Sequence, residues 1–348
     1  MRKKIQITEA DIRVTEGSLE SRQIDEIRKD IHDTPEYEGL PLRVLRSNST
    51  VMFDIFVKAF DGFKKVAKKS TIVTDKLIDK LTENKYDTVY TPYEQKNDMY
   101  AYVENNLDTI IYDTTVTQEQ KSKVIYSTAT DIADALFSSP ITTGSIQRTR
   151  GIIKPMLDSI LSDNTTIDSL IAVSSYDYYT YTHSVDVSVY SLGIGRELNL
   201  FPTTLNLLGE AAILHDIGKS QIDIGIVNKP GRLTAEEFDE MKLHPTYAYQ
   251  LLVEHGVKNP AILSGARDHH EKLDGSGYPR GLKGEDISKF ARIIAIADIF
   301  NALTTRRSYK PALSTFEALK IMKHDMEGEL DPDLLKRFIY MMSEKRND

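Results

Sequence analysis

Two adjacent histidines, His269 and His270, lead directly into a loop that holds three glycines and a proline before Leu282. Neutral imidazole is the commonest side-chain metal ligand, and glycine lets the backbone approach a ligand because it has no Cβ. A purely structural loop would need the glycines but not the histidine pair. The segment therefore predicts metal ligands beside a loop that could shape a pocket.

Three further histidines and two aspartates stand in contexts that suit metal ligands. His215 and Asp216 end an apolar stretch that predicts a helix. Because neighbouring helical residues point about 100° apart, the pair could share one metal, or Asp216 could bridge two. Asp298 lies within an apolar helical pattern, where an ionised carboxylate needs a partner. The remaining candidates are His183, within a predicted helix, and His244, at a predicted helix start.

These candidates amount to two aspartates and five histidines of the eight in the chain; His32, His255 and His324 are expected to be solvated or capping residues. Seven ligands are too many for one metal with open positions and suit two. The chain has no cysteine, so a metal must use nitrogen and oxygen, a set that suits iron, manganese, zinc or nickel. Two ions about 3.5–4 Å apart can clamp the attacking and leaving oxygens of a phosphoryl displacement, and they make a water ionise near neutral pH.

The composition is that of an ordinary protein with room for more than one domain. The chain has 348 residues, 40% apolar and 28% charged, and a net charge of −8. This acidic balance argues against binding to nucleic-acid polymers or membrane surfaces, although not against a local basic pocket for a phosphate ligand. No apolar stretch has the length of a signal-peptide core or of a membrane span, so we expect a cytoplasmic protein.

The elements that would carry these residues predict a multi-domain α+β chain. Residues 1–40 form a polar segment, and 41–115 predict a small α/β module. Helical patterns follow almost without strand signals, as a linker over 116–150 with a break at Pro140 and an all-α domain over 151–348. Within the module, strands are predicted over 41–45, 51–60 and 86–90, and helices over 75–84, capped by Thr74, and 93–107.

Several spaced motifs of the second half resemble the HD-GYP group of the HD-domain phosphohydrolases. The resemblance covers residues 150–340, and the Gly277-Tyr278-Pro279 signature is intact. The other matching motifs are His215-Asp216-Ile217-Gly218-Lys219, the Lys229–Thr234 segment, His244-Pro245, His269-His270-Glu271 and Asp298.

The resemblance implies an all-α HD-GYP domain with two or three divalent metal ions, usually iron or manganese. Its implied activity is hydrolysis of cyclic di-GMP to the linear dinucleotide pGpG and, in some members, on to GMP. By position, one metal would be held by His183, His215, Asp216 and Asp298. Asp216 would also bridge to a second metal, held by His244, His269 and His270.

The resemblance also implies residues that act on the substrate. Lys219 would lie beside the scissile phosphate and would stabilise charge or assist the leaving oxygen. Arg307 and Lys310 match positions that grip the ligand's phosphates, which suits a guanidinium fork and a mobile ammonium. Tyr278 and Asn301 are further candidates, although Tyr278 could equally anchor the fold.

This chain departs from the family pattern at three positions. Tyr179 stands where some members have a glutamate that helps to hold a third metal, so we expect a dinuclear centre. Asn301 replaces the usual aspartate and loses its charge, and Ala248 replaces a usual glycine. Beside the ligands, Glu271 and Asp274 could orient the histidines.

The resulting hypothesis is a cytoplasmic, metal-dependent cyclic di-GMP phosphodiesterase. The N-terminal module would sense a signal or dock, either with a second copy of the chain or with a protein partner. One alternative is a cyclic di-GMP receptor with little turnover that signals through this module. Another is a phosphodiesterase for a different cyclic dinucleotide, such as cyclic GMP-AMP.

Overall fold

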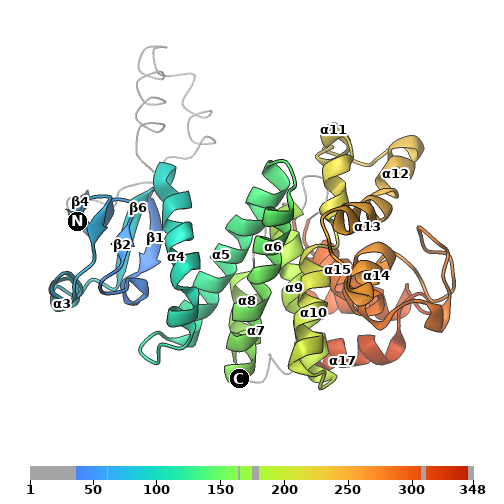
Figure 1. Cartoon of the computed structure of the whole chain (residues 1–348). Coiled ribbons are helices and arrows are strands. Elements are labelled where there is room, and N and C mark those ends of the chain that lie inside the picture. Colours follow the sequence, from blue (N-terminus) through green and yellow to red (C-terminus); the bar gives the residue numbers. More distant parts are fainter. Residues whose placement is uncertain (1–36, 61, 164, 175–179, 307–310, 344–348) are drawn as a thin grey trace, which may run out of the picture. The chain divides into compact units, whose positions relative to one another are not determined.

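The computed structural model describes residues 37–60, 62–163, 165–174, 180–306 and 311–343. The chain divides into two compact units between Tyr102 and Val103. The first contains the strands, and the second consists of helices in its described residues (Figure 1). The domain boundaries predicted at residues 40, 115 and 150 stay a prediction.

The first unit is built on two small antiparallel sheets. The larger sheet has the strand order β1-β6-β3-β4, and the smaller pairs β2 with β5. The strands are β1 (Tyr37–Pro41), β2 (Thr50–Val51), β3 (Ile55–Ala59), β4 (Gly62–Ala67), β5 (Thr71–Ile72) and β6 (Thr88–Pro92). One helix, α3 (Asp75–Glu83), and two short 3-10 turns, η1 (Leu42–Val44) and η2 (Tyr93–Gln95), complete its described part before α4.

The structure differs from the strands predicted for this unit. Of the stretch 41–45 only Pro41 belongs to a strand, because η1 follows, and the strand predicted over 86–90 lies two residues later, as β6. Thr74 caps α3, because its side chain accepts a hydrogen bond from the backbone N–H of Leu77 at 3.2 Å. The strand predicted over 51–60 is broken into β2 and β3, because Asp54 between them bonds to Lys65 and to the backbone of Lys69. Since the strand pairs are antiparallel, the unit is α+β rather than a parallel α/β module.

The second unit is a helical bundle with short turns. Its long helices before the site are α4 (Lys96–Ile111), which begins in the first unit, α5 (Gln118–Ser138), α6 (Thr143–Gly151), α7 (Ile153–Ser162) and α8 (Thr166–Val173). The next elements are α9 (Thr180–Glu197), α10 (Pro202–Ile213), η3 (Ile217–Gln221), α11 (Ile224–Val227), α12 (Ala235–Met241), α13 (His244–Glu254) and α14 (Pro260–Asp268). The chain continues with η4 (Gly284–Asp286), α15 (Lys289–Thr304), α16 (Thr315–His324) and α17 (Pro332–Ser343).

Helix α9 forms the centre of this bundle. Its residues from Thr182 to Gly195 are buried without interruption, which explains why its sequence shows no polar face. It packs against α5, α8, α10, α15 and α17 (Figure 1). The polar side chains of α9 therefore lie inside the protein and need partners there.

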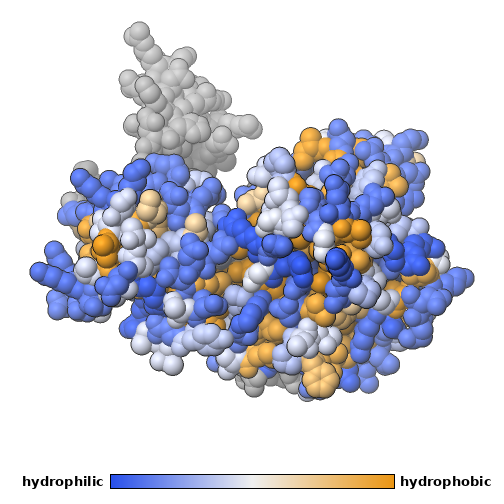
Figure 2. All heavy atoms as spheres, viewed as in Figure 1, coloured by the Kyte–Doolittle hydropathy of each residue, from blue (hydrophilic) through white to orange (hydrophobic). Residues whose placement is uncertain are grey.

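The face of the second unit seen in Figure 2 is mostly hydrophilic, and hydrophobic residues appear over α11 and also lower on this face. Among them, Ile224 is 70% exposed, and Phe238 of α12 is 49% exposed. A search of the described residues finds no helix whose length and apolar character would let it cross a membrane.

Candidate metal centre and pocket

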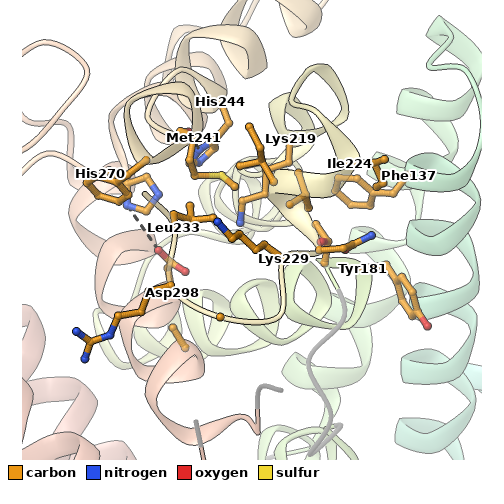
Figure 3. Close-up of a pocket in the computed structure, with 18 of the residues that line it drawn as sticks. Phe137, Tyr181, Lys219, Ile224, Lys229, Leu233, Met241, His244, His270 and Asp298 are labelled. Atoms are coloured by element: carbon orange, nitrogen blue, oxygen red, sulfur yellow. Dashed lines mark hydrogen bonds and ion pairs between the residues drawn. The ribbon is translucent and has the colours of Figure 1, made fainter. Parts of the chain in front are cut away.

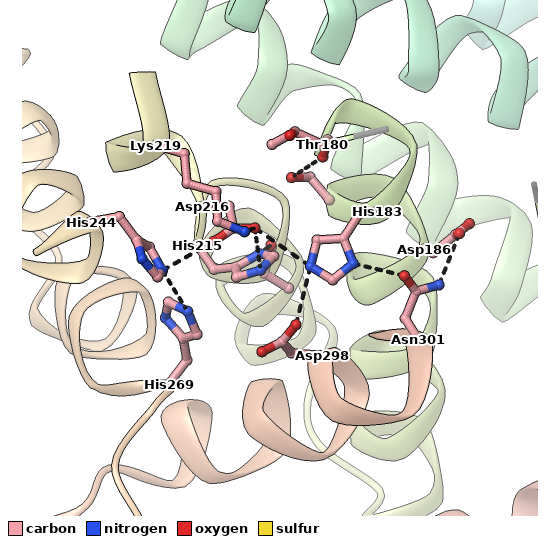
Figure 4. A network of polar contacts seen from close by, with 12 residues as sticks. Thr180, His183, Asp186, His215, Asp216, Lys219, His244, His269, Asp298 and Asn301 are labelled. Carbon is pink, nitrogen blue, oxygen red and sulfur yellow. Dashed lines mark hydrogen bonds and ion pairs between the residues drawn. The ribbon is translucent and has the colours of Figure 1, made fainter. Parts of the chain in front are cut away.

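The seven predicted metal ligands come together at one place in the second unit (Figure 4; His270 is labelled in Figure 3). They come from five segments that are far apart in the sequence. They are His183 on α9, His215 and Asp216 between α10 and η3, His244 at the start of α13, His269 and His270 after α14, and Asp298 on α15.

The first group of ligands is His183, His215 and Asp298. Their ligand atoms all lie within 4.8 Å of one another. The Nε2 atom of His183 is 3.1 Å from Oδ1 of Asp298. This close set of two imidazoles and a carboxylate could hold one metal ion.

The second group is His244, His269 and His270, whose ligand atoms also lie within 4.8 Å of one another. The Nε2 atoms of His244 and His269 are 3.4 Å apart. Two imidazole nitrogens at this distance suit a shared cation, because their lone pairs can both point at it.

Asp216 lies between the two groups. Its Oδ2 atom is 3.5 Å from Nε2 of His183 and 3.4 Å from Nε2 of His215. Its Oδ1 atom is 3.2 Å from Nε2 of His244. Each carboxylate oxygen therefore faces a different group, which is the placement a bridging ligand requires.

Backbone carbonyls orient three of the imidazoles. The Nδ1 atoms of His215, His244 and His269 lie 2.7, 2.7 and 2.8 Å from the carbonyl oxygen three residues earlier. A carbonyl only accepts, so each Nδ1 must carry the proton and donate. Each Nε2 then directs its lone pair into the centre, as metal-binding histidines do.

The local electrostatics favour ionised carboxylates beside mostly neutral imidazoles. Burial opposes ionisation of Asp216, but His215 and Lys219 outweigh it, so the pKa of Asp216 is well below its usual value. The pKa of Asp298 is also well below its usual value, because His183 outweighs the effect of burial. Burial and neighbouring histidines lower the pKa of His269, and burial lowers that of His270 to about 3.

The donor set fits divalent cations. The Nε2 atom of His215 is buried and makes no hydrogen bond, which is rare for a buried polar atom. Asp216 raises the pKa of His215 against the effect of burial, so the pair attracts positive charge. A metal ion would satisfy both the orphaned nitrogen and the buried carboxylate.

Gly218 allows η3 and α13 to approach closely. A Cβ atom at this position would lie 1.9 Å from the carbonyl oxygen of His244 and 2.5 Å from the backbone nitrogen of Ala248. Only glycine fits between these backbone atoms. The approach brings Asp216, just before η3, to His244, the first residue of α13.

The loop after His270 is held by carboxylates and a glycine. Glu271 is buried and accepts hydrogen bonds from the backbone N–H groups of Arg280 and Leu282. Asp274 accepts from Ser276. Both carboxylates therefore hold the loop, whereas the sequence predicted that they could orient the histidines. A Cβ at Gly277 would lie 2.5 Å from the carbonyl oxygen of His270.

Tyr278 of this loop stacks on His270, with ring centroids 4.8 Å apart and an interplanar angle of 26°. Burial raises the pKa of its phenol, so the hydroxyl stays protonated. The ring also lines the pocket described next. The stacking of Tyr278 on His270 agrees with an anchoring role, and its position in the pocket wall would also allow contact with a substrate.

A pocket of about 1350 Å³ opens beside the candidate metal ligands (Figure 3). His244, His270 and Asp298 form part of its wall, and Lys219 and Lys229 extend into it. The cationic side chains of the wall are Lys219, Lys229, Arg232 and Arg306. Helix α5 contributes Asp134, Phe137 and Ser138. Positive charge beside paired metal ligands suits a phosphate ligand.

The predicted substrate-binding residues differ in whether they line the pocket. Lys219 lines the pocket, and its Nζ atom donates to Oδ2 of Asp216. Asn301 is buried behind His183, and its amide bonds to His183 and Asp186, so this placement does not support the predicted contact with substrate. Arg307, Lys310 and Tyr179 lie outside the described residues, and their roles stay predictions.

Tyr126 and Asp186 were not among the predicted site residues. Asp186 lies in an apolar stretch of α9, the same signal that identified Asp298. Tyr126 comes from α5, and its part in the site follows only from tertiary packing. Its hydroxyl donates to Oδ1 of Asp186 at 2.7 Å.

Comparisons with known proteins agree with this geometry. Residues 165–334 match the family model described as HD domain. The sequence is 35% identical to a cyclic di-GMP phosphodiesterase of Pseudomonas aeruginosa over 181 residues, 52% of this chain and 44% of that protein. It is 37% identical to 3′3′-cGAMP-specific phosphodiesterase 3 of Vibrio cholerae over 206 residues, 59% of this chain and 42% of that protein. The chain thus spans less than half the length of either relative.

A solved structure shows the same fold. It is an HDG"Y"P protein from Bdellovibrio bacteriovorus, with a TM-score of 0.63 and 20% sequence identity, and the match covers 88% of this chain and all of that one. The family match, the curated relatives and the shared fold agree with the order of the sequence motifs. Residues 165–334 are therefore an HD domain, and they carry the motifs of the HD-GYP group.

Proposed function

We propose that this chain hydrolyses cyclic di-GMP with two divalent metal ions, iron or manganese, held by the seven clustered ligands. The observation that carries the proposal is the position of Asp216. Its two oxygens face two separate sets of histidines, 3.4 Å from His215 on one side and 3.2 Å from His244 on the other. A mononuclear site would not need a carboxylate in this position.

Each ion would take ligands from one group and share Asp216. The first group would supply His183, His215 and Asp298, and the second His244, His269 and His270. Two ions held there would stabilise charge on the phosphoryl oxygens and would make a water acidic enough to act as the nucleophile near neutral pH. The buried, oriented imidazoles keep this donor set in place before substrate arrives.

The pocket side chains would bind and orient the dinucleotide. Lys219 is held by Asp216 at the edge of the centre, so its ammonium can donate to a phosphate oxygen or to the departing ribose oxygen. In hydrolysis to pGpG, a water oxygen bonds to phosphorus, the bond from phosphorus to the 3′ oxygen breaks, and that oxygen leaves with a proton. Arg232 lines the same pocket and can neutralise the second phosphate, whereas Lys229 is paired with Glu237.

The substrate class is supported by the two relatives, which are named for cyclic di-GMP and 3′3′-cGAMP. Cyclic GMP-AMP is accordingly the second candidate substrate. Both ligands carry two phosphodiesters in a ring, so the metal centre and the cationic wall would serve either one. The choice between guanine and adenine would be made by pocket residues away from the metals.

The test is turnover by the purified chain loaded with Mn²⁺ or with Fe²⁺, with each cyclic dinucleotide, read by chromatography of pGpG and GMP. We expect hydrolysis with two ions per chain. Asp216→Asn should reduce the rate by more than about 100-fold, because even outer partners of metal ligands are worth 10–100-fold. His255→Gln, a histidine outside the centre, is the control and should keep activity and metal content.

Folded, metal-loaded protein that turns over neither dinucleotide would refute the proposed activity. Tight binding of cyclic di-GMP without turnover would favour a receptor instead. Faster hydrolysis of cyclic GMP-AMP than of cyclic di-GMP would retain the mechanism and change the substrate.

A further inference from the structure

A line of buried polar side chains leads from α5 to the metal ligand His183 (Figure 4 shows its part from Asp186 to His183). The Tyr126 hydroxyl donates to Oδ1 of Asp186 at 2.7 Å. The Asn301 amide nitrogen donates to Oδ2 of Asp186 at 3.0 Å. At the other end of this amide, Oδ1 of Asn301 lies 2.7 Å from Nδ1 of His183.

The direction of each hydrogen bond in this line follows from the groups. Above its pKa of about 7 Asp186 is a carboxylate that only accepts, so both of its oxygens require donors there. The Asn301 amide must therefore turn its NH₂ toward Asp186 and its oxygen toward His183. An amide oxygen only accepts, so Nδ1 of His183 must carry the proton. The lone pair of Nε2 then faces Oδ1 of Asp298, 3.1 Å away, and two such acceptor atoms suit a shared metal ion.

Because these side chains are buried, each of them depends on its hydrogen-bond partners in this line. Tyr126 is 6% exposed, Asp186 and His183 are each 1% exposed, and Asn301 is 2% exposed. Few water molecules can replace a missing partner at such depth. Burial of an ionisable group is costly, and it raises the pKa of Asp186 to about 7 against the hydrogen bonds of Tyr126 and Asn301.

His183 differs here from three of its fellow ligands. His215, His244 and His269 each use a backbone carbonyl three residues earlier. His183 lies in the first turn of α9 and uses the side chain of Asn301 instead. Its tautomer therefore depends on residues that can be substituted.

We propose that Asp186 and Tyr126 are positioning residues that, through Asn301, hold His183 with its proton on Nδ1 and so keep Nε2 free to bind metal. The proposal rests on the proposed function only in taking His183 as a metal ligand. Tyr126 lies outside residues 165–334, which match the HD family model. A helix beyond the family domain thus supports the metal centre.

The direct test exchanges the carboxylate of Asp186 and the amide of Asn301. In Asp186→Asn, the new amide keeps its bond from the Tyr126 hydroxyl when its oxygen stays toward Tyr126. Two NH₂ groups then meet unless Asn301 turns over, which would force the proton of His183 onto Nε2. In Asn301→Asp, two carboxylates would meet. The double variant Asp186→Asn/Asn301→Asp restores a donor facing an acceptor at every step, with the carboxylate now beside His183.

The first readout is Mn²⁺ affinity of the full chain, measured by electron paramagnetic resonance titration. We expect each single variant to bind about 10–100-fold more weakly, as for other partners of metal-bound histidines, and the double variant to recover most of the loss. The second readout is the tautomer of His183 in metal-free, ¹⁵N-histidine-labelled protein, assigned with His183→Gln. Wild type and double variant should carry the proton on Nδ1, and Asp186→Asn should carry it on Nε2.

A matched control separates positioning from stability. Glu210→Gln removes another buried carboxylate, which bonds to Arg150 and Asn206 and to no residue of this line, and should lower stability without changing Mn²⁺ affinity. Tyr126→Phe removes one hydroxyl and should weaken Mn²⁺ binding by a smaller factor than Asp186→Asn. If a single variant does not fold, folding and metal binding by the double variant still decide the question.

Unchanged Mn²⁺ affinity and tautomer in folded Asp186→Asn would overturn the proposal. So would a double variant that binds no better than the single variants, because the pair would then serve packing alone. Failure of the proposed activity looks different: wild-type protein would hydrolyse no cyclic dinucleotide, while metal affinity and tautomer would still respond to the exchange.

Discussion

Among single residues, Asp186 should leave a signature in the pH dependence of stability. Its pKa is raised from 3.8 to about 7, first by burial. Between these values the folded chain holds a proton that the unfolded chain releases. The resulting stabilisation is present below pH 3.8 and is lost as the pH rises through 7. Asp186 therefore makes stability fall with pH across this window, by up to about 1.4 kcal/mol per pH unit.

Asp186→Asn should remove this dependence. The free energy of unfolding of variant minus wild type should become more positive from pH 5 to pH 7 and level off above pH 8. Urea unfolding of the metal-free chain at four pH values measures the difference, in which the other titrating groups cancel. A constant difference over this range would mean that Asp186 keeps an ordinary pKa in the folded chain.

The same residue shows what could be predicted from sequence. An aspartate inside an apolar helix needs a buried partner, and this argument identified Asp298. It applies equally to Asp186, which follows Val185 and precedes Val187 on α9. What the sequence could not provide was the partner, because Tyr126 and Asn301 lie 60 and 115 residues away.

At the scale of elements, the contact between η3 and α13 sets the distance between the two ligand groups. Gly218→Ala would place a Cβ atom 1.9 Å from the carbonyl oxygen of His244, and backbone atoms cannot rotate away. Overpacking of this kind costs about 1–3 kcal/mol. The movement of α13 would also separate Asp216 from His244, so the second ion should bind more weakly than the first.

Thermal unfolding and metal analysis check this prediction. Gly218→Ala should melt at a lower temperature and retain less than its full complement of metal after dialysis. Gly151→Ala is the matched control, because a Cβ atom there meets nothing within 4 Å. A Gly218→Ala protein with wild-type stability and two retained ions would contradict the role assigned to this contact.

Some element boundaries could be predicted from neighbouring residues, but contacts between distant segments could not. The cap at Thr74 and the start of α13 at His244 were predicted from neighbouring residues and are confirmed. The His215-Asp216 pair was expected to end a helix, but α10 ends at Ile213 and the pair lies in the turn before η3. That turn depends on the fit of Gly218 against α13, a contact between segments that no local pattern contains.

In the molecule as a whole, α5, which falls in the stretch predicted as a linker, packs within the second unit. It contributes Tyr126 to the line behind His183, and Asp134 and Phe137 to the pocket wall. It also packs against α8 and α9. Its fully buried apolar side chains include Val124, Ile125, Ile132, Ala133 and Leu136.

A chain that lacks α5 should therefore fail to fold stably. Burial of a large aliphatic side chain contributes about 1.5–3 kcal/mol, so the four larger side chains amount to about 6–12 kcal/mol. That range matches the whole stability of an ordinary domain, about 5–15 kcal/mol.

Residues 96–348, which keep α4 whole, should melt cooperatively and bind Mn²⁺. Residues 142–348 should show no cooperative transition in circular dichroism, although they contain the whole stretch that matches the HD family model. If the shorter fragment melted cooperatively and bound Mn²⁺ with the affinity of the longer one, α5 would be a dispensable linker, and the support of His183 by Tyr126 would lose its basis.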